Sequence, residues 1–283
     1  MNGKLYVVGT PIGNLSDFSP RAIQTLQDVD FIAAEDTRVT MKILNHFEIK
    51  KEMVSYYEHN KRQRGEVICE RIQNGENCAI VTDAGMPAIS DPGEDLVKLC
   101  HELGIQVVSV PGPTAFATAL AISGMETGRF TFEGFLSVSK KSRFEHLEEI
   151  KDEKRTIIFY EAPHKVANTI KDLYATLGDR KIAIVREITK IHEEVINTTL
   201  KEANELYTNG SLKGELVLII EGKKEEVTEI TLEDAVNDAK ALVEKGLSMN
   251  QAAKEIASKT PFKKGDIYKA LLWFVIFVQE NVI

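Results

Sequence analysis

Three loops rich in glycine, proline and small polar residues could carry the chemistry of this chain. The sequence reads YVVGTPIGN at residues 6–14, VTDAGMPAISDPGEDLV at 81–97 and SVPGPTAFATALAISG at 109–124. Each loop lies at the end of an apolar run that predicts a strand, and glycine there lets the backbone approach a ligand closely. Because open α/β sheets bind ligands at the carboxyl ends of their strands, we expect these loops to form a ligand site.

The opening loop departs from a dinucleotide-binding loop. That motif places G-x-G-x-x-G directly before a helix, so that free amides face a pyrophosphate. Here Gly9 and Gly13 flank Pro11, which lacks an amide hydrogen, and no helix is expected before Pro20. A tight turn fits the local chemistry but leaves the length of the polar loop at 10–19 unexplained.

The second loop divides into a structural half and a candidate ligand-binding half. Asp91 is expected to cap a helix, with Pro92 in its first position and Glu94 and Asp95 near the positive end of its dipole. Residues 83–87 have no such structural explanation and become the ligand candidate.

The third loop turns into a helix of small residues. These residues allow close helix packing, which is one interpretation. The other is that Thr114 and Ala115, at the helix start, present a hydroxyl and amides to a ligand.

Apolar β-branched runs alternate with helical patterns, which predicts parallel strands joined by crossover helices. We expect strands at 5–8, 31–34, 78–81 and 106–110, and helices at 20–28, 38–46, 62–73 and 91–102. After a helix at 115–123, strands are expected at 130–135, 156–160, 181–185, 193–197 and 215–220. The short gap after 185 predicts a hairpin, and therefore a mixed second sheet.

This pattern predicts an α/β protein with two α/β domains and a helical module. The expected divisions are a parallel-sheet N-terminal domain at 1–112, a mixed-sheet second domain at 113–222, and a helix-turn-helix-like module at 231–283. The polar segment at 222–231 is expected to link the module to the rest.

Composition narrows the class of protein. Hydrophobic residues make up 43% of the chain and charged residues 28%, as in a soluble globular protein. A net charge of −8 argues against a general nucleic-acid coat but leaves room for a local basic patch. The three cysteines lack the spacing of metal ligands, so no metal site is expected. The sequence has no room for a signal peptide before the first expected strand and no apolar run long enough to span a membrane. These features together predict a cytoplasmic protein.

Six motifs in order carry a family resemblance: GTPIGNLSD, AAEDTR, DAGMPAISDPG, VPGPTA, FYEAPHK and KGE. Together they resemble the tetrapyrrole methylase superfamily, specifically its ribosomal RNA small subunit methyltransferase I branch. The resemblance covers essentially the whole chain. It implies a two-domain tetrapyrrole-methylase-like fold with S-adenosylmethionine in the cleft. It also implies 2′-O-methylation of a cytidine in the decoding region of 16S rRNA.

Two alternatives stay open. One is a tetrapyrrole-type methylase of a small molecule, although the turn at 83–87 lacks the Gly-Asp-Pro form of corrin-type relatives. The other is a nucleic-acid-binding protein without enzymatic activity, in which the helical module is the functional part.

The resemblance also implies a set of cofactor-binding residues. They are Pro11, Asp83, Ala84, Gly85, Met86, Ile89, Thr114, Ala115, Tyr160, Glu161, Gly214 and Glu215.

A ribose hydroxyl is a poor nucleophile at neutral pH, so a base or a cation is expected beside the cofactor. Asp36 as base and Lys190 as cation are the leading catalytic hypothesis, and structural ion pairs are the competing interpretation. Further substrate-binding candidates beside them are Glu35, Arg38 and Arg186.

Contact with 16S rRNA or the small ribosomal subunit is expected at two basic stretches. The first contains Lys140, Lys141 and Arg143, and the second contains Lys263 and Lys264 in the helical module. Solvated charges are an equally good interpretation of both. The family and the apolar ending LLWFVIFV lead us to expect a homodimer.

Overall fold

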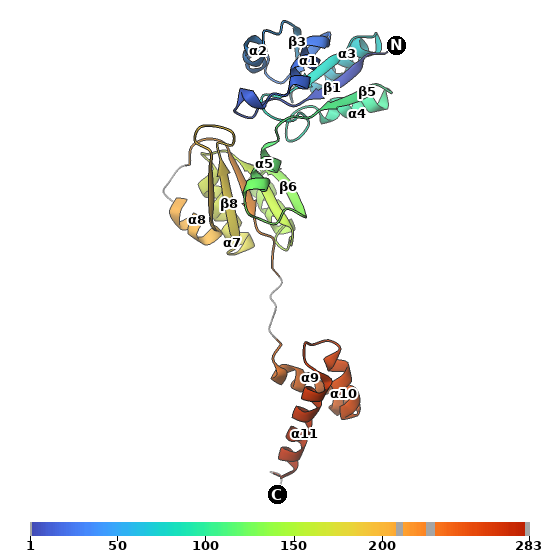
Figure 1. The fold of residues 1–283 in the computed structure, drawn as a ribbon, viewed down its shortest axis with the longest axis vertical. Helices are drawn as coiled ribbons and strands as arrows, with labels where there is room; N and C mark the ends of the chain where they lie inside the picture. Colours follow the sequence, from blue (N-terminus) through green and yellow to red (C-terminus); the bar gives the residue numbers. More distant parts are fainter. Residues whose placement is uncertain (1, 208–211, 225–229, 281–283) are drawn as a thin grey trace. The chain divides into compact units, whose positions relative to one another are not determined.

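The computed structural model describes residues 2–207, 212–224 and 230–280 (Figure 1). Its contacts divide the chain into two compact units, Met1–Lys223 and Lys224–Ile283. The first unit contains two sheets, and the second consists of helices.

The first sheet is parallel throughout, as predicted, with strand order β3-β2-β4-β1-β5. Its strands are β1 (Lys4–Val8), β2 (Phe31–Ala34), β3 (Glu52–Ser55), β4 (Cys78–Val81) and β5 (Gln106–Val110). The connecting helices are α1 (Pro20–Asp28), α2 (Thr37–His46), α3 (Lys61–Gln73) and α4 (Glu94–Glu102). Because the strands run the same way, all their carboxyl ends lie at one edge, with β4, β1 and β5 side by side.

Local sequence explains most of these elements. Ser19 caps α1 by accepting a hydrogen bond from the amide of Ala22 at 3.1 Å, and Pro20 follows in the first helical position. β2 and β4 are buried along their whole length, which matches their continuous apolar sequences. The pattern missed β3, since this short edge strand is only partly buried and has no apolar run.

The second sheet is mixed, again as predicted, with order β6-β7-β10-β8-β9. Its strands are β6 (Phe130–Phe135), β7 (Thr156–Glu161), β8 (Lys181–Arg186), β9 (Glu194–Thr199) and β10 (Leu216–Ile220). β6 and β7 are parallel, whereas β10 runs antiparallel to both neighbours and β8–β9 form the expected hairpin. The helices of this half are α5 (Ala115–Ile122), α6 (Lys140–Glu149), α7 (Val166–Leu177) and α8 (Leu200–Tyr207).

Different helices pack on the two faces of the second sheet. One face packs on α6, α7 and α8 through an aliphatic cluster that includes Leu147, Ile170 and Leu200. The other face packs on α5, which lies between the two sheets in Figure 1. The apolar cluster on that face also contains Ile12, a residue of the loop after β1.

The C-terminal unit contains α9 (Leu232–Glu244), α10 (Met249–Ala257) and α11 (Lys264–Glu280) around a small alanine-rich core. Reciprocal capping boxes start α9, with Thr231 and Asp234, and α10, with Ser248 and Gln251. α11 contains the apolar ending, whose side chains lie outside the described residues from 274 onward. Over residues 2–207, 212–224 and 230–280, no helix has the length and hydropathy that crossing a membrane requires.

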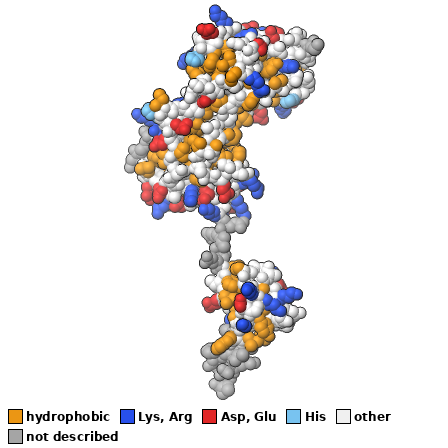
Figure 2. Space-filling view, in the orientation of Figure 1, with side chains coloured by type: hydrophobic (Ala, Val, Ile, Leu, Met, Phe, Trp, Pro, Cys, Tyr) orange, Lys and Arg blue, Asp and Glu red, His pale blue; other side chains and the backbone are white. Residues whose placement is uncertain are grey.

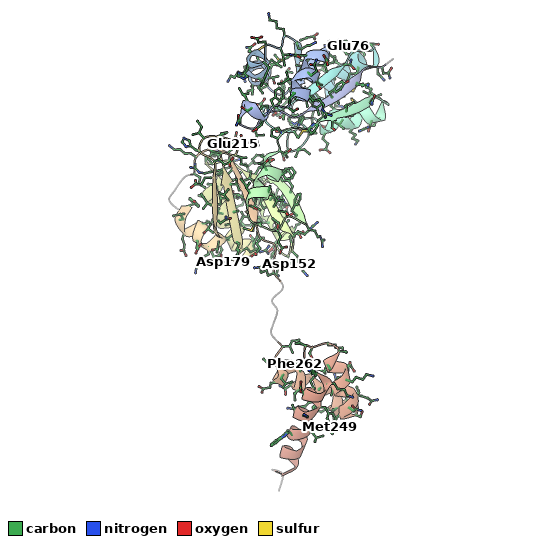
Figure 3. All side chains as sticks on the ribbon, in the orientation of Figure 1. Glu76, Asp152, Asp179, Glu215, Met249 and Phe262 are labelled. Atoms are coloured by element: carbon green, nitrogen blue, oxygen red, sulfur yellow. The ribbon has the colours of Figure 1, made fainter. Side chains whose placement is uncertain are left out.

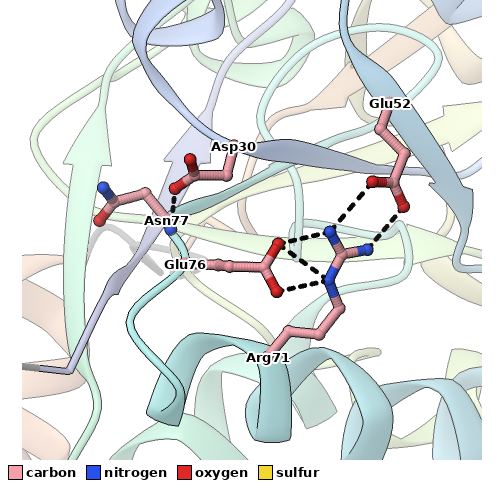
Figure 4. A network of polar contacts seen from close by, with 5 residues as sticks. All are labelled: Asp30, Glu52, Arg71, Glu76 and Asn77. Carbon is pink, nitrogen blue, oxygen red and sulfur yellow. Dashed lines mark hydrogen bonds and ion pairs between the residues drawn. The ribbon is translucent and has the colours of Figure 1, made fainter.

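Arg71, at the end of α3, ties together three parts of the first sheet (Figure 4). Its guanidinium donates to Glu52 of β3 at 2.6 and 3.1 Å and to Glu76 before β4 at 2.5 to 3.2 Å. The same group lies 3.7 Å from the ring centroid of Phe31 in β2. Its hydrogen bonds hold the pKa of both carboxyl groups below the ordinary value. The pairs are therefore fully formed at neutral pH.

We predict that Arg71→Met lowers the free energy of unfolding by about 1 kcal/mol or less, because two largely exposed carboxylates lose their shared cation and water screens much of the attraction. Urea unfolding at pH 7 measures this loss. Since the folded state lowers both pKa values, the stabilisation exists at neutral pH and is lost as pH falls through those values. Arg64→Met, on the exposed face of the same helix, is the control. An equal loss from both variants would contradict the prediction.

Candidate active site

A cavity of about 330 Å³ lies where the loops of the first sheet meet the second sheet. This volume is within the range of about 300 to 1,000 Å³ typical of small-molecule sites. Residues before the second sheet contribute Ile12, Ala84, Gly85, Met86, Ile89, Ser90, Asp91, Thr114 and Ala115 to its wall. The second sheet and its adjoining loops contribute Phe135, Tyr160, Glu161, Ala162, Pro163, Ile188, Glu215, Leu216 and Val217. Figure 3 shows Glu215 at the end of the second half that faces the first sheet, with Asp152 and Asp179 at the opposite end.

The opening loop is bound to the loop after β4 by backbone pairing. The amide of Thr10 donates to the carbonyl of Gly85 at 2.9 Å, and the amide of Gly85 donates to the carbonyl of Thr10 at 3.2 Å. The buried hydroxyl of Thr10 also donates to the carbonyl of Thr82 at 3.1 Å. The first two candidate loops therefore form one continuous wall.

Two glycines join the opening loop to the loop after β5. A Cβ atom added to Gly112 would lie 2.8 Å from the Cα of Gly9, and one added to Gly9 would lie 2.7 Å from Gly112. No side chain fits between two backbones at that distance. The contact between the two loops therefore requires glycine at position 9. This contact explains Gly9 without a bound phosphate.

The loop at 84–93 holds its shape at a conformational cost. Ala88 and Ser90 have φ values of 67° and 63°, which residues with a Cβ adopt rarely. Gly93 has a φ of 143° and is the residue from which α4 begins, without a capping side chain. The prediction that Asp91 caps this helix is therefore wrong: the helix starts three residues later, and Asp91 lines the cavity instead.

Asp91 lies in a cluster of negative groups. Burial, followed by the charges of Glu35 and Asp83, raises the pKa of Asp91 to about 7. The Thr82 hydroxyl is a hydrogen-bonding neighbour of Asp91 but donates to Glu35 at 2.5 Å. Because a hydroxyl has a single proton, it cannot satisfy both carboxylates. Near neutral pH the Asp91 carboxyl is poised between its neutral and charged forms.

An aromatic group forms the opposite wall. The hydroxyl of Tyr160 accepts a hydrogen bond from the amide of Phe116 at 3.1 Å, which fixes its ring beside the start of α5. Phe132 and Phe135 pack against that ring, with centroid distances of 4.9 and 5.5 Å. Phe135 remains 58% exposed and offers an apolar face to the cavity.

The structure brings most of the predicted cofactor residues together. Those that line the cavity are Ala84, Gly85, Met86, Ile89, Thr114, Ala115, Tyr160, Glu161 and Glu215. The carboxylate of Glu161 is held by the Thr169 hydroxyl and the amide of Ala162, so it also fixes the start of α7.

Three predicted cofactor residues lie beside the cavity rather than in its lining. Pro11 is buried between Thr10 and Ile12. Asp83 accepts a hydrogen bond from the amide of Asp36 at 3.2 Å. Gly214, with a φ of 88°, leaves the space that the Glu187 carboxylate fills.

The pattern missed several wall residues: Ile12, Ser90, Asp91, Phe135, Ala162, Pro163, Ile188, Leu216 and Val217. Ile12 had a usable signal, since it is a lone large apolar residue in a polar loop. Asp91 was missed because the sequence around it is typical of a helix start, so it was assigned a capping role. The strand residues carried no signal, because only the packing of the sheet decides which face meets a ligand.

Asp36 and Lys190 lie in separate ion pairs. Asp36 pairs with Arg38 at 2.6 Å, and the hydrogen bond from Arg38 lowers its pKa to about 2. Lys190 pairs with Glu187 and with Glu215 at 3.0 Å each. Lys190 therefore contacts the cavity wall through Glu215. Asp36 instead caps the start of α2, where it accepts a hydrogen bond from the amide of Arg38.

The remaining predicted substrate residues differ in availability. Arg143 is mostly buried and donates to Asp172 at 2.6 Å, and Arg186 pairs with Glu194 at 2.5 Å. Glu35 accepts from Thr82. Lys140, Lys141, Lys263 and Lys264 are exposed. Within the described part of the chain, no group of three or more acidic, histidine or cysteine residues could hold a metal ion.

Comparison with known proteins gives a consistent result. The family model of tetrapyrrole (corrin/porphyrin) methylases matches residues 4–204. Ribosomal RNA small subunit methyltransferase I of Synechocystis is 44% identical over 272 residues, which cover 95% of this chain and 98% of that protein. The Thermotoga maritima protein of the same name is 45% identical, and the match covers 78% of this chain but 100% of that protein.

A solved structure shares the fold. Uroporphyrin-III C-methyltransferase of Thermus thermophilus, complexed with S-adenosylhomocysteine, has a TM-score of 0.56 and 16% sequence identity. The similarity covers 78% of this chain and 98% of that one.

We predict that Asp91→Asn raises the free energy of unfolding at pH 8 by about 1 to 2 kcal/mol, after allowance for partial solvent screening. The native pKa of about 7 lies above the ordinary value, so the native carboxyl destabilises the fold increasingly as pH rises from about 4 to 7. The gain should vanish below pH 4, roughly, where the group is protonated in both states. Urea unfolding across pH, with Glu94→Gln as control, measures it; a gain independent of pH would instead indicate a packing effect.

Proposed function

Because the chain belongs to the tetrapyrrole methylase family, and within it to the ribosomal RNA small subunit methyltransferases I, we propose that it methylates small-subunit rRNA with S-adenosylmethionine. The finer proposal is transfer to the ribose 2′-hydroxyl of a cytidine in the decoding region of 16S rRNA. The observation that supports a cofactor-dependent methyl transfer is the cavity formed by three adjacent loops and the second sheet.

The wall suits an adenosyl sulfonium better than a phosphate ligand. Ile12, Met86, Ile188 and Val217 supply apolar surface on which a nucleoside can pack. Thr114 starts α5 without a capping hydrogen bond from its side chain, so its hydroxyl is available to a polar ligand group. The cofactor, when bound, supplies an electrophilic methyl group on a positively charged sulfur.

The contribution of the chain itself is chiefly positioning. In-line transfer from a sulfonium disperses charge, so holding the reacting oxygen in line with the methyl group can provide much of the rate. The rigid loop contacts through Thr10, Gly85 and Gly112 suit that task.

Lys190 remains our candidate for the cation near the ribose oxygen, since Glu215 joins it to the wall. Asp36 remains the candidate base, although its low pKa makes it a weak proton acceptor.

We assign the C-terminal unit a role in holding RNA. Lys254, Lys259, Lys263, Lys264 and Lys269 lie on α10, on α11 and in the connection between them, and Figure 2 shows basic and hydrophobic side chains on the face in view. Lys259 is paired with Glu255 at 2.9 Å, which leaves the other lysines to define the patch. The Thermotoga relative is matched along its whole length by 78% of this chain, so we propose that the unit adds affinity rather than chemistry. We also propose that the protein acts in the cytoplasm as a homodimer on 16S rRNA or the small subunit.

The test is mass mapping of rRNA nucleosides after small subunits from a methylation-deficient strain are incubated with the protein and labelled S-adenosylmethionine. We expect the label in a 2′-O-methylcytidine of the decoding region. Label on a base, or transfer only to small molecules such as porphyrins, would contradict the proposal.

Removing residues 229–283 should leave cofactor affinity within about twofold, while methylation at limiting subunit concentration falls about tenfold. The deletion falls between compact units, so residues 1–223 are expected to stay folded. Calorimetry and the methylation assay at several salt concentrations check both parts. An unchanged salt dependence would argue against the RNA-holding role.

We predict that Gly112→Ala weakens S-adenosylmethionine binding about tenfold or more, because the loops at Gly9 and Gly112 must separate to admit the methyl group. Calorimetry measures the affinity. The matched control is Gly128→Ala, since a Cβ at Gly128 meets no atom within 4 Å. Equal affinity in the two variants would show that the loop contact does not shape the site.

A further inference from the structure

Asp91 differs from the other carboxylates in the wall of the cavity. Glu161 is held by the Thr169 hydroxyl and the Ala162 amide, and Glu215 is paired with Lys190 at 3.0 Å. Among the described residues, Asp91 has no salt bridge to a cation. It is therefore a partly buried acid whose charge nothing in the described protein neutralises.

The surroundings of Asp91 increase this imbalance. Glu35 follows β2, Asp83 follows β4, and both raise the cost of a negative charge on Asp91. From the second sheet, Tyr160 lines the same cavity, and its pKa is raised by burial first and to a smaller extent by the charge of Asp91. A buried charge is stable only when it is paired, so this part of the cavity favours a cationic ligand group.

Neither Glu35 nor Asp83 is as well placed for that role. Glu35 accepts from the Thr82 hydroxyl at 2.5 Å, and Asp83 accepts from the Asp36 amide at 3.2 Å. Neither residue lines the cavity, whereas Asp91 does. The positive φ values of Ser90 and Gly93 on either side hold the chain in the conformation that puts Asp91 in the wall.

We propose that the Asp91 carboxylate is the counter-ion of the sulfonium of S-adenosylmethionine, through which the cavity distinguishes this cofactor from neutral S-adenosylhomocysteine. The inference rests on the proposed function for the identity of the cofactor. A positive charge beside Asp91 favours its ionised form, so binding near neutral pH releases a proton from Asp91 to solvent. Once the sulfur is neutral, Asp91 regains a proton from solvent, and the attraction that favoured the cofactor is absent for the product.

Calorimetric titration of the full chain with each ligand tests this assignment. At pH 8, Asp91→Asn should weaken S-adenosylmethionine binding roughly tenfold and change S-adenosylhomocysteine binding less than about twofold. In the native protein, cofactor affinity should fall between pH 8 and pH 6 as Asp91 takes up its proton, with little change for the neutral product. The Asn variant should lose this pH dependence.

Two further variants separate charge from structure. Asp91→Glu keeps the charge and should recover part of the preference, while Glu94→Gln removes a nearby exposed charge and should behave as native. Circular dichroism and urea unfolding establish that each variant is folded.

Equal weakening for both ligands, or an unchanged affinity ratio in Asp91→Asn, would overturn the counter-ion role while the native protein still methylates rRNA. Failure of the native protein to bind either ligand would overturn it together with the proposed function.

Discussion

Ile12 belongs to the loop after β1, yet it packs in the apolar cluster of the second sheet with Ile158 and Val217. Its side chain is 7% exposed, and burial of this kind stabilises a contact by about 1.5 to 3 kcal/mol. The loop that carries Ile12 is itself paired with Gly85 and packed against Gly112. One apolar anchor therefore holds three loops of the first sheet against the second, and the ligand cavity depends on that arrangement.

Charges near the cavity fall into two groups. Arg38, Lys190 and Arg186 are each paired with a neighbouring carboxylate. Asp91 has no cationic partner within the described residues, and burial together with the charges of Glu35 and Asp83 raises its pKa. Such an acid suits a site for a cationic cofactor, because the positive charge of the ligand pairs with a carboxylate that has no cationic partner in the protein.

The cavity and the helical unit to which we assign RNA binding are formed by separate parts of the chain. The cavity is small and largely apolar, and its wall comes entirely from residues 12–217. A separate compact unit of helices follows, with exposed lysines on a chain whose net charge is −8. A relative matched over its full length by 78% of this chain is consistent with such a division of labour.

The sequence alone determined the two sheets, since buried strands such as β2 and β4 are continuous apolar runs and the hairpin β8–β9 follows from a short gap. It missed β3, whose partly exposed edge position leaves no such run. The family resemblance identified Ala84, Thr114 and Tyr160, which do line the cavity.

Tertiary structure alone decided the position of Asp91 in the cavity wall. The local pattern Ser-Asp-Pro-Gly favoured a helix cap, but the distant loops that surround Asp91 draw it into the wall. Helix and strand formation depends on neighbours in sequence, whereas cavity lining and the charge of a carboxyl group depend on neighbours in space.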